Sequence, residues 1–259
     1  MSRNEAFSKQ ISNKRFGGSM EIKIGIASLA KSGAEYCGDS YSLVERLGGM
    51  TLILSDGHGN TAAAQQTSRW VTQRARTLVL QGKDNDAAAR AVHDELYEMK
   101  DRKVACALTI FGVDAETESV SIGRSGQTPV YVWTEEYETA YDDEATALGM
   151  SRSVNPQTYE LPLAQGMILV AVSEGVRVAG KKRGGAHFEE EKLWEIVRGN
   201  PAEDAAFIAK NILDYALALD QEQPSEDMTV AVLGVAPDKA ENAGVGFLSA
   251  SYPISVLEA

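Results

Sequence analysis

Four acidic residues border unusually apolar segments of the chain. Two follow such a segment and two precede one; they are Asp39, Asp56, Glu174 and Asp227. If these segments are strands of antiparallel sheets, the end of one strand lies beside the start of the next. The four carboxylates would then converge on one edge. Converging like charges raise one another's pKa unless a cation neutralises them, so the pattern indicates a metal site.

Each acid alone also fits a plainer structural role. The pair Asp56-Gly57 is typical of a turn, and an acid beside a strand can guard against aggregation. The absence of the usual zinc-binding motifs limits which metal could bind. Cys37 and Cys106 lack CxxC spacing, and the histidines lack HExxH spacing. Oxygen ligands remain, and they favour Mg or Mn over Zn or Cu.

The overall composition limits the possible partners. The chain has 259 residues, which suits one domain with extensions. Its net charge of −12 repels nucleic acid and anionic lipid, so neither is expected as a partner. It has no run of about 18 apolar residues, so no membrane span is expected. The N-terminus lacks the apolar block of a signal peptide, so the expected location is the cytoplasm.

The elements that carry the acids can be predicted from hydrophobic periodicity. Strands are predicted at 21–29, 40–47, 50–55, 104–113, 119–123, 129–134, 137–141, 159–163, 167–172 and 228–235. Helices are predicted after a cap at Asn60 or Thr61, from Asp86, at 188–198, and after a cap at Asn200. The helices are grouped instead of alternating with the strands, which favours an α+β fold of antiparallel sheets covered by helices.

The same pattern suggests how the chain is divided. Residues 1–20 are polar and predict a flexible lead-in, 21–236 form the domain, and 237–259 are an extension with a weak pattern. The glycine-rich stretch 180–185 is predicted to be a loop.

Several stretches around the acids resemble a known family. They are Ser-Gly-Ala-Glu-Tyr-Cys-Gly-Asp-Ser-Tyr-Ser (32–42), Leu-Ser-Asp-Gly-His-Gly-Asn (54–60), Gly-Arg-Ser-Gly-Gln-Thr-Pro (123–129), Val-Ser-Glu-Gly-Val (172–176) and Ser-Glu-Asp-Met-Thr-Val (225–230). In this order and roughly this spacing they resemble the PPM family of metal-dependent protein phosphatases, which are protein phosphatase 2C-like. Within it they resemble the bacterial branch typified by the stage II sporulation phosphatase. The resemblance covers about residues 22–235.

The resemblance implies a fold and a metal site. The fold would be an antiparallel β-sandwich flanked by helices on both sides, in the order α-β-β-α. Two ions, Mn or Mg, would lie at one edge. Asp56 would bridge both ions and the carbonyl of Gly57 would be a further ligand. Asp227 and Asp39 match the acids of the family's last and first motifs.

Glu174 departs from the family's pattern, which has Asp-Gly where this chain has Glu-Gly. The extra methylene moves the carboxylate by about 1.5 Å, whereas a site needs positioning to about 0.5 Å. Either the longer acid reaches its metal by another rotamer or through water, or it weakens the binding of that metal.

The activity implied is that of a protein serine/threonine phosphatase acting on a bacterial regulatory protein. A metal-bound hydroxide would attack phosphorus directly. His58 would protonate the leaving alkoxide, or it is a loop histidine without that role. The substrate would be a phosphorylated protein, by analogy an anti-anti-sigma-type regulator.

Three points remain open. The domain is either an active phosphatase or a pseudo-phosphatase that binds phosphoproteins. Glu174 supports the second hypothesis. Ala171–Gly175 loosely resembles a nucleophile elbow with Ser173 as the nucleophile, but an elbow needs a helix directly afterwards and none is expected at 176–185. The cations of 177–183 either attract a phosphoprotein or form a solvated loop.

Overall fold

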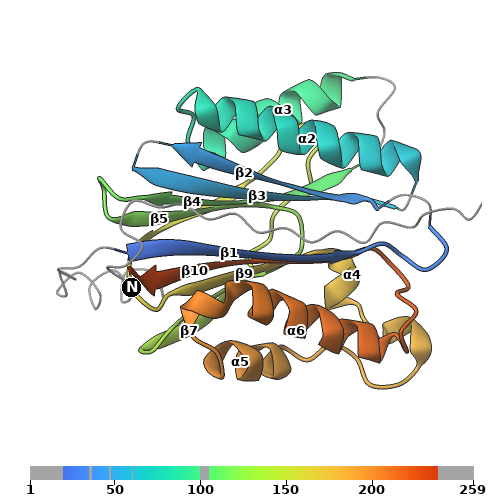
Figure 1. The fold of residues 1–259 in the computed structure, drawn as a ribbon. Coiled ribbons are helices and arrows are strands. Elements are labelled where there is room, and N and C mark those ends of the chain that lie inside the picture. The colour runs from blue at the N-terminus through green and yellow to red at the C-terminus, as the bar shows by residue number, and fades with distance from the viewer. Residues whose placement is uncertain (1–19, 35–36, 47, 60, 100–104, 239–259) are drawn as a thin grey trace, which may run out of the picture.

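Two antiparallel sheets stack face to face, and helices cover the outer face of each sheet (Figure 1). The structure is a computed structural model that describes residues 20–34, 37–46, 48–59, 61–99 and 105–238. The four layers confirm the predicted helix-sheet-sheet-helix sandwich. The predicted lead-in, apart from residue 20, and most of the predicted extension lie outside the described residues, and the boundaries of the domain stay a prediction.

Each sheet has five strands. The first has the order β1 (Met20–Leu29), β10 (Met228–Pro237), β9 (Ile168–Val172), β6 (Val130–Thr134) and β7 (Tyr137–Tyr141). The second has the order β2 (Asp39–Arg46), β3 (Gly49–Gly57), β4 (Cys106–Asp114), β5 (Ser119–Ser125) and β8 (Gln157–Pro162).

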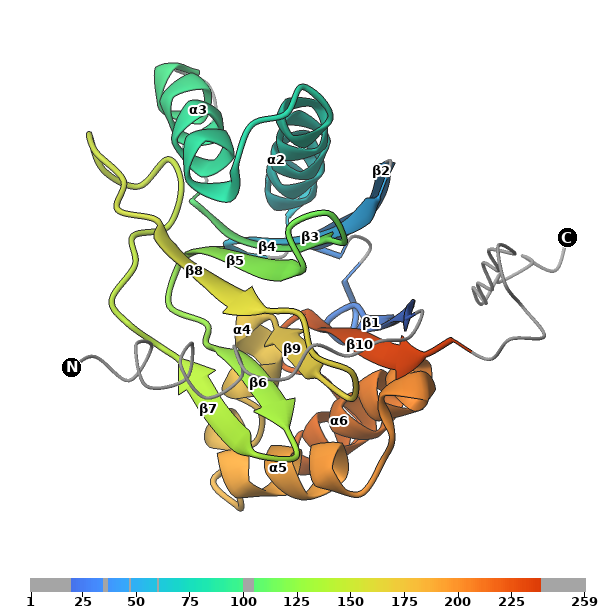
Figure 2. The ribbon, with the colours of Figure 1, turned by 90° about the vertical axis from the view of Figure 1, so that its left-hand side faces the viewer.

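The helices divide between the two sheets, as an edge-on view shows (Figure 2). The second sheet is covered by α2 (Ala62–Leu80) and α3 (Asn85–Glu98). The first is covered by α4 (Glu174–Arg177), α5 (Glu190–Arg198) and α6 (Ala205–Leu219), with short 3-10 turns η1 (Lys181–Arg183) and η2 (Ala202–Asp204). Within the described residues, no helix is both long enough and apolar enough to cross a membrane.

Both faces of each sheet are buried, which explains the nearly continuous apolar strands. In β10, Leu233 packs between the sheets and its neighbour Val232 packs under the helices. In β3, Leu52 packs between the sheets and Ile53 packs under α2 and α3. Successive side chains of a strand point to opposite faces, so a strand with two covered faces needs apolar residues at every position.

The helix boundaries follow mostly from local sequence. Thr61 caps α2 by accepting a hydrogen bond from the N–H of Ala64 at 3.2 Å, whereas the alternative cap, Asn60, lies outside the described residues. The inner face of α2 is buried at helical spacing; it includes Ala64, Ser68, Val71, Ala75 and Leu78. The predicted cap of the last helix was wrong. Asn200 donates back to the carbonyl of Ile196 at the end of α5, and the turn η2 precedes α6.

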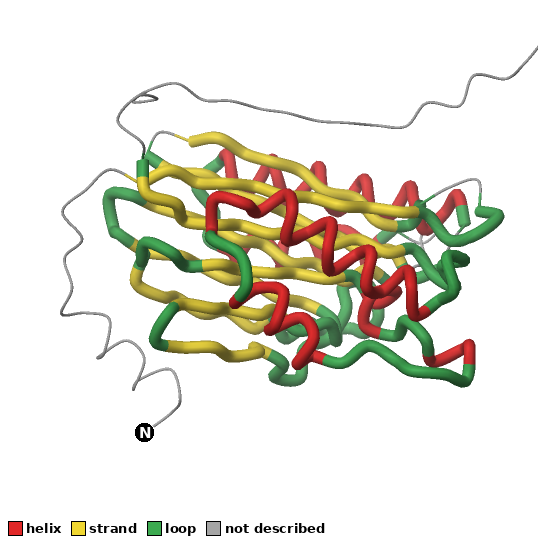
Figure 3. The backbone as a smooth tube through the Cα atoms, turned by 60° about the horizontal axis from the view of Figure 1, so that its bottom comes forward, coloured by secondary structure: helices red, strands yellow, loops and turns green. Residues whose placement is uncertain are grey.

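The long strands of the two sheets run alongside one another, with the helices outside them (Figure 3). Antiparallel pairing therefore returns the chain repeatedly to the same end of the sandwich. At one such end β2 begins, β3 and β9 stop, and β10 begins. That end carries all four acids singled out in the sequence.

Candidate metal centre

Asp39 and Asp56 are partners in the antiparallel register of β2 and β3. Directly opposed residues of an antiparallel pair project on the same face, about 4.5–5.5 Å apart at their Cβ atoms. The structure thus brings together two acids that are separated by most of two strands. The predicted convergence holds for this pair by backbone pairing alone.

Asp39 is buried without a hydrogen-bond partner. Its residue exposure is 9%, and neither carboxylate oxygen has a partner in the described structure. Burial, followed by repulsion from Asp56, raises the pKa of Asp39 well above its ordinary range. Burial also raises the pKa of Asp56. A buried carboxylate without a partner is costly, and a cation is one way to remove the cost.

Asp227 holds the loop that leads into β2. Its Oδ1 accepts the N–H of Lys31 at 2.8 Å and its Oδ2 accepts the N–H of Gly38 at 2.6 Å. A carboxylate has about four acceptor positions, so these two bonds leave capacity for a cation. Asp227 therefore links the start of β10 to the start of β2 and directs its oxygens toward the loop beside Asp39.

Gly38 lies where a side chain has no room. A Cβ atom there would stand 2.7 Å from the carbonyl oxygen of Gly59 and 3.0 Å from that of Gly57. It would also stand 3.0 Å from Oδ2 of Asp227. The N–H of Gly57 donates to the carbonyl of Gly38 at 3.1 Å. Three oxygens thus crowd Gly38, so only glycine fits at the position directly before Asp39.

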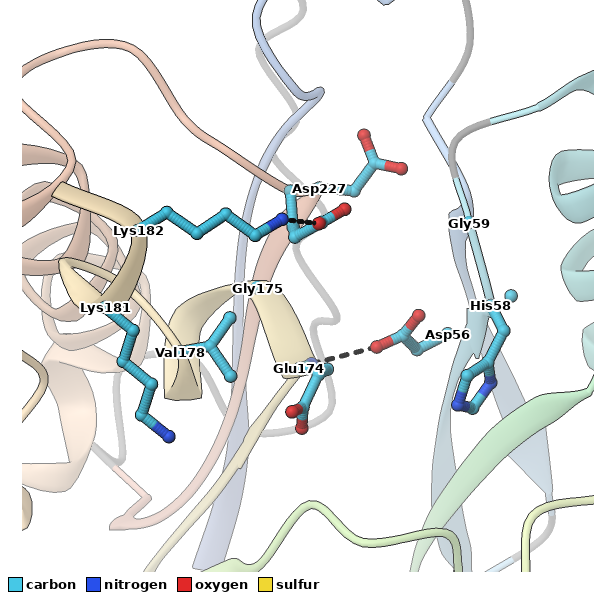
Figure 4. Close-up of a pocket in the computed structure, with 11 residues that line it drawn as sticks. Asp56, His58, Gly59, Glu174, Gly175, Val178, Lys181, Lys182 and Asp227 are labelled. Carbon is cyan, nitrogen blue, oxygen red and sulfur yellow. Dashed lines mark hydrogen bonds and ion pairs between the residues drawn. The ribbon is translucent and has the colours of Figure 1, made fainter.

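Glu174 contributes its backbone to the site, and its carboxylate is turned away. The N–H of Glu174 donates to Oδ2 of Asp56 at 2.9 Å. Its carboxylate binds Arg177 one turn later, with Oε2 2.8 Å from Nε and Oε1 2.5 Å from Nη2. In Figure 4 this carboxylate points away from Asp56. The orientation of Glu174 therefore differs from the converging acid expected from the sequence.

A pocket of about 490 Å³ opens beside these residues. It is lined by Asp56, Gly57, His58, Gly59, Glu174, Gly175, Val178, Lys181, Lys182, Glu226 and Asp227. Asp56 and His58 stand on one side of it, and Lys181 and Lys182 on the opposite side (Figure 4). The pocket thus lies between the end of β3 and the segment from α4 to η1, at the end of the sandwich where the acids gather.

His58 presents its imidazole to the pocket. Its Nδ1 lies 3.1 Å from the carbonyl oxygen of Ala105. A carbonyl only accepts, so in this hydrogen bond Nδ1 carries the proton. The backbone N–H of His58 donates to the same oxygen at 2.9 Å. The ring is therefore oriented by the strand beside it, which leaves Nε2 as the nitrogen able to exchange a proton with a bound molecule.

Ser173 is not placed as a nucleophile. It is buried; the N–H of Thr229 donates to its hydroxyl at 2.8 Å, and that hydroxyl donates to the carbonyl of Asp227 at 3.3 Å. The expectation that no helix follows it was wrong, because α4 begins at Glu174. That helix has only four residues. The hydroxyl connects β9 to β10 and is absent from the residues that line the pocket.

The donor set fits a divalent cation at Asp39 and Asp56. Both supply hard carboxylate oxygens, and those of Asp39 are buried and unpartnered. As the side chains lie, however, no group of three or more His, Cys, Asp or Glu residues among those described could hold a metal ion. Glu174 faces Arg177, and Asp227 binds two backbone N–H groups. The roles predicted for the four acids and for Gly57 therefore stay predictions.

The sandwich and its acidic end define the class of protein to which the chain is similar. A solved structure of the PP2C phosphatase domain of stage II sporulation protein E from Bacillus subtilis, with a fragment of its regulatory domain, has a TM-score of 0.71 and 23% identity. The match covers 85% of this chain and 65% of that one. The catalytic domain of the serine/threonine protein phosphatase PstP, in complex with two manganese ions, has a TM-score of 0.64 and 16% identity, covering 84% of this chain and 100% of that one. The chain thus has the fold of the protein phosphatase 2C-like proteins.

The sequence itself is more specific. The family model for stage II sporulation protein E matches residues 47–236. The chain belongs to the stage II sporulation protein E family. It is 24% identical over 221 residues to the stage II sporulation protein E of Bacillus subtilis (strain 168), a match covering 84% of this chain. This chain spans 26% of the length of that relative.

Proposed function

We propose that this chain is a metal-dependent phosphatase that hydrolyses phosphoserine or phosphothreonine in a protein. The observation that carries the proposal is the facing pair of Asp39, which is buried, and Asp56, which is half-buried and lines the pocket. Both oxygens of Asp39 are unpartnered, in a chain of the stage II sporulation protein E family. Two ions of Mn or Mg are proposed, and the two manganese ions of PstP support that number.

Each acidic residue has its own task in this proposal. Asp39, Asp56 and Asp227 would hold the ions through carboxylate oxygens, and Gly57 through its carbonyl. The N–H of Glu174 fixes one oxygen of Asp56, and a carboxylate has further acceptor positions with which to bind an ion. When bound, divalent ions supply positive charge that activates water and stabilises the phosphoryl oxygens. Asp56 is half-buried beside the pocket, where such charge acts strongly.

His58 would act as the general acid that protonates the leaving group. Its Nδ1 is held by the carbonyl of Ala105, so Nε2 is the position from which a protonated ring would donate to the serine or threonine oxygen. The requirement is largest for an alkoxide leaving group and smallest for an aryl phosphate. His58→Ala is therefore expected to lower turnover more on a phosphoserine peptide than on an aryl phosphate, and equal losses on both would contradict this role.

The partner proposed is a phosphorylated regulatory protein. A regulator of the anti-anti-sigma type is the specific candidate, and it rests on family analogy alone. The net charge of −12 argues against nucleic acid and anionic membranes as partners. The cytoplasmic location stays a prediction.

The proposal is tested by hydrolysis of an aryl phosphate and of a phosphoserine peptide in Mn²⁺, in Mg²⁺ and in a chelator. Turnover with either metal and none in the chelator is expected. Asp56→Asn should lose more than about a hundredfold, because it removes a ligand at the centre of the site. Asp94→Asn is the matched control, since Asp94 is exposed on α3 and does not line the pocket. Turnover that survives both chelation and Asp56→Asn would exclude the mechanism.

A second candidate is a pseudo-phosphatase that binds phosphoproteins without turnover. The observation that favours it is the carboxylate of Glu174, which is bound to Arg177 instead of facing Asp56. Calorimetric titration with Mn²⁺ separates the two functions when combined with the turnover assay. Two bound ions with turnover support the enzyme, whereas phosphopeptide binding without turnover at saturating Mn²⁺ supports the pseudo-phosphatase.

A further inference from the structure

Most cations around the pocket are already neutralised within the chain. Lys182 forms an ion pair with Glu226, and Lys31 approaches the same carboxylate at 3.9 Å. Arg177 is bound to Glu174. These side chains have partners of opposite charge, so their attraction for an anionic ligand is weak. The cationic run 177–183 is thus less available than its sequence suggests.

Lys181 is different. It lines the pocket and is exposed. Across the residues that the structure describes, its ammonium group has neither an ion pair nor a hydrogen bond. Figure 4 shows it on the wall that faces Asp56 and His58, with Val178 beside it. It is a full positive charge at the rim of a pocket in a chain whose net charge is −12.

The turn that carries Lys181 is fixed to the metal-binding end of the fold. Gly180 has a φ of 81°, and a Cβ there would stand 2.0 Å from the carbonyl of Ala186, so only glycine fits. The N–H of Gly180 donates to Oδ1 of the buried Asp220 at 2.7 Å. Oδ2 of Asp220 accepts the N–H of Ser225 at 2.6 Å. One buried carboxylate therefore ties the turn to the segment that enters Asp227.

This anchoring separates two interpretations of the cationic stretch. A solvated loop would leave the lysine position undefined. Here η1 is closed at both ends by left-handed glycines, since Gly184 has a φ of 70°, and Arg183 donates to the carbonyl of Gln223 at 2.5 Å. Within the loop predicted for 180–185, the structure has the 3-10 turn η1. It gives Lys181 a defined place relative to Asp227.

We propose that Lys181 binds a carboxylate of the substrate protein next to its phosphorylated residue, so that the site prefers acidic phosphopeptides. The inference rests on the proposed phosphatase function and adds a substrate class to it. The phosphate itself would lie at the wall that carries Asp56, next to the ions that Asp56 and the buried Asp39 would hold. Lys181 stands on the opposite wall at the rim, where the polypeptide on either side of the phosphorylated residue would pass.

The test uses the full chain with Mn²⁺ and three substrates. Two are phosphoserine peptides that differ only in having Asp or Asn beside the phosphoserine, and the third is an aryl phosphate. Wild type is expected to prefer the Asp peptide. In Lys181→Gln, the ratio of kcat/KM for the Asp and Asn peptides should fall by about 1.4-fold to fivefold, the range of an exposed ion pair. Lys181→Arg keeps the positive charge and should keep the preference for the Asp peptide. About 1 M salt should abolish that preference in wild type.

Lys83→Gln is the matched control. Lys83 is an exposed lysine in the turn between α2 and α3, outside the pocket lining, and it should leave the ratio and the turnover unchanged. The proposal is overturned if wild type has no preference for the Asp peptide. It is also overturned if Lys181→Gln lowers all three substrates equally, since Lys181 would then serve the phosphate or the fold.

Failure of the phosphatase function gives a separate result. Binding of the same two peptides, labelled and followed by fluorescence anisotropy, measures the preference without turnover. No hydrolysis of any substrate together with an intact, Lys181-dependent preference would refute the enzyme and keep the acidic-peptide site. Hydrolysis without a Lys181-dependent preference would do the reverse.

Discussion

Arg177→Gln is expected to tighten the binding of Mn²⁺ to this chain. Arg177 holds both carboxylate oxygens of Glu174, so Glu174 can reach an ion beside Asp56 only after it leaves Arg177. Arg177 thus competes with the metal for one acid. Removing the guanidinium removes the competitor and leaves the backbone N–H that Glu174 donates to Asp56.

The size of the effect follows from the exposure of the pair. The side chains are 34% exposed for Arg177 and 42% for Glu174. Ion pairs exposed to this degree are worth about 0.2–1 kcal/mol. Since about 1.4 kcal/mol is a factor of ten in affinity, the upper end corresponds to a gain of about fivefold for an ion that uses Glu174.

Isothermal titration calorimetry with Mn²⁺ measures this gain without relying on turnover. Arg90→Gln is the control, because it removes an i,i+4 pair with Asp86 on α3, away from the pocket. Loss of a nearby positive charge would itself favour a cation, so Arg177→Gln must also be compared in a Glu174→Gln background. The gain should largely disappear there. Equal gains in both backgrounds, or no gain in a protein whose Mn²⁺ binding needs Asp56, would refute the competition.

Three further outcomes follow from the site. Burial and repulsion from Asp56 raise the pKa of Asp39, so the metal-free protein should lose stability as pH rises from the ordinary aspartate pKa through that raised value. Asp39→Asn should flatten this fall in Tm with rising pH. Gly38→Ala should cost about 1–3 kcal/mol of stability in chemical denaturation, because its Cβ meets three oxygens. Burial acts against ionisation of Asp220, but the N–H groups of Gly180 and Ser225 outweigh it and lower its pKa. Its contribution should be lost as pH falls through that lowered value, so Asp220→Asn should destabilise by about 1–3 kcal/mol at pH 7 and progressively less in acid.

Much of the fold could be predicted because its strands are buried on both faces. Segments such as 50–55 and 228–235 are apolar at nearly every position, which defines a strand whether or not its partners are known. Antiparallel pairing then brings strand starts and strand ends together, so the gathering of Asp39, Asp56 and Asp227 at one end also followed from the sequence. Backbone geometry decides both features.

The parts that could not be predicted depend on competing side-chain contacts. The spacing of Glu174 and Arg177 is that of an ion pair on a helix. The sequence did not predict this helix, because α4 has only four residues and one of them is a glycine. The cap expected at Asn200 failed for a similar reason, because its amide finds the carbonyl of Ile196 instead. Hydrophobic periodicity does not show which of two available partners a polar side chain will bind.

The position of Glu174 serves the site in two separable ways. Its N–H orients Asp56, and this contact requires only that the chain turn into α4 after β9. Ligation of an ion requires the carboxylate, which here is bound to Arg177. The longer acid leaves the first role intact and alters only the second. Glu174→Asp keeps the N–H and shortens the reach to Arg177, so any change it makes in Mn²⁺ affinity reports on the carboxylate, through its ligation of the ion and its release from Arg177 together. A loss of stability would show that the ion pair also supports α4.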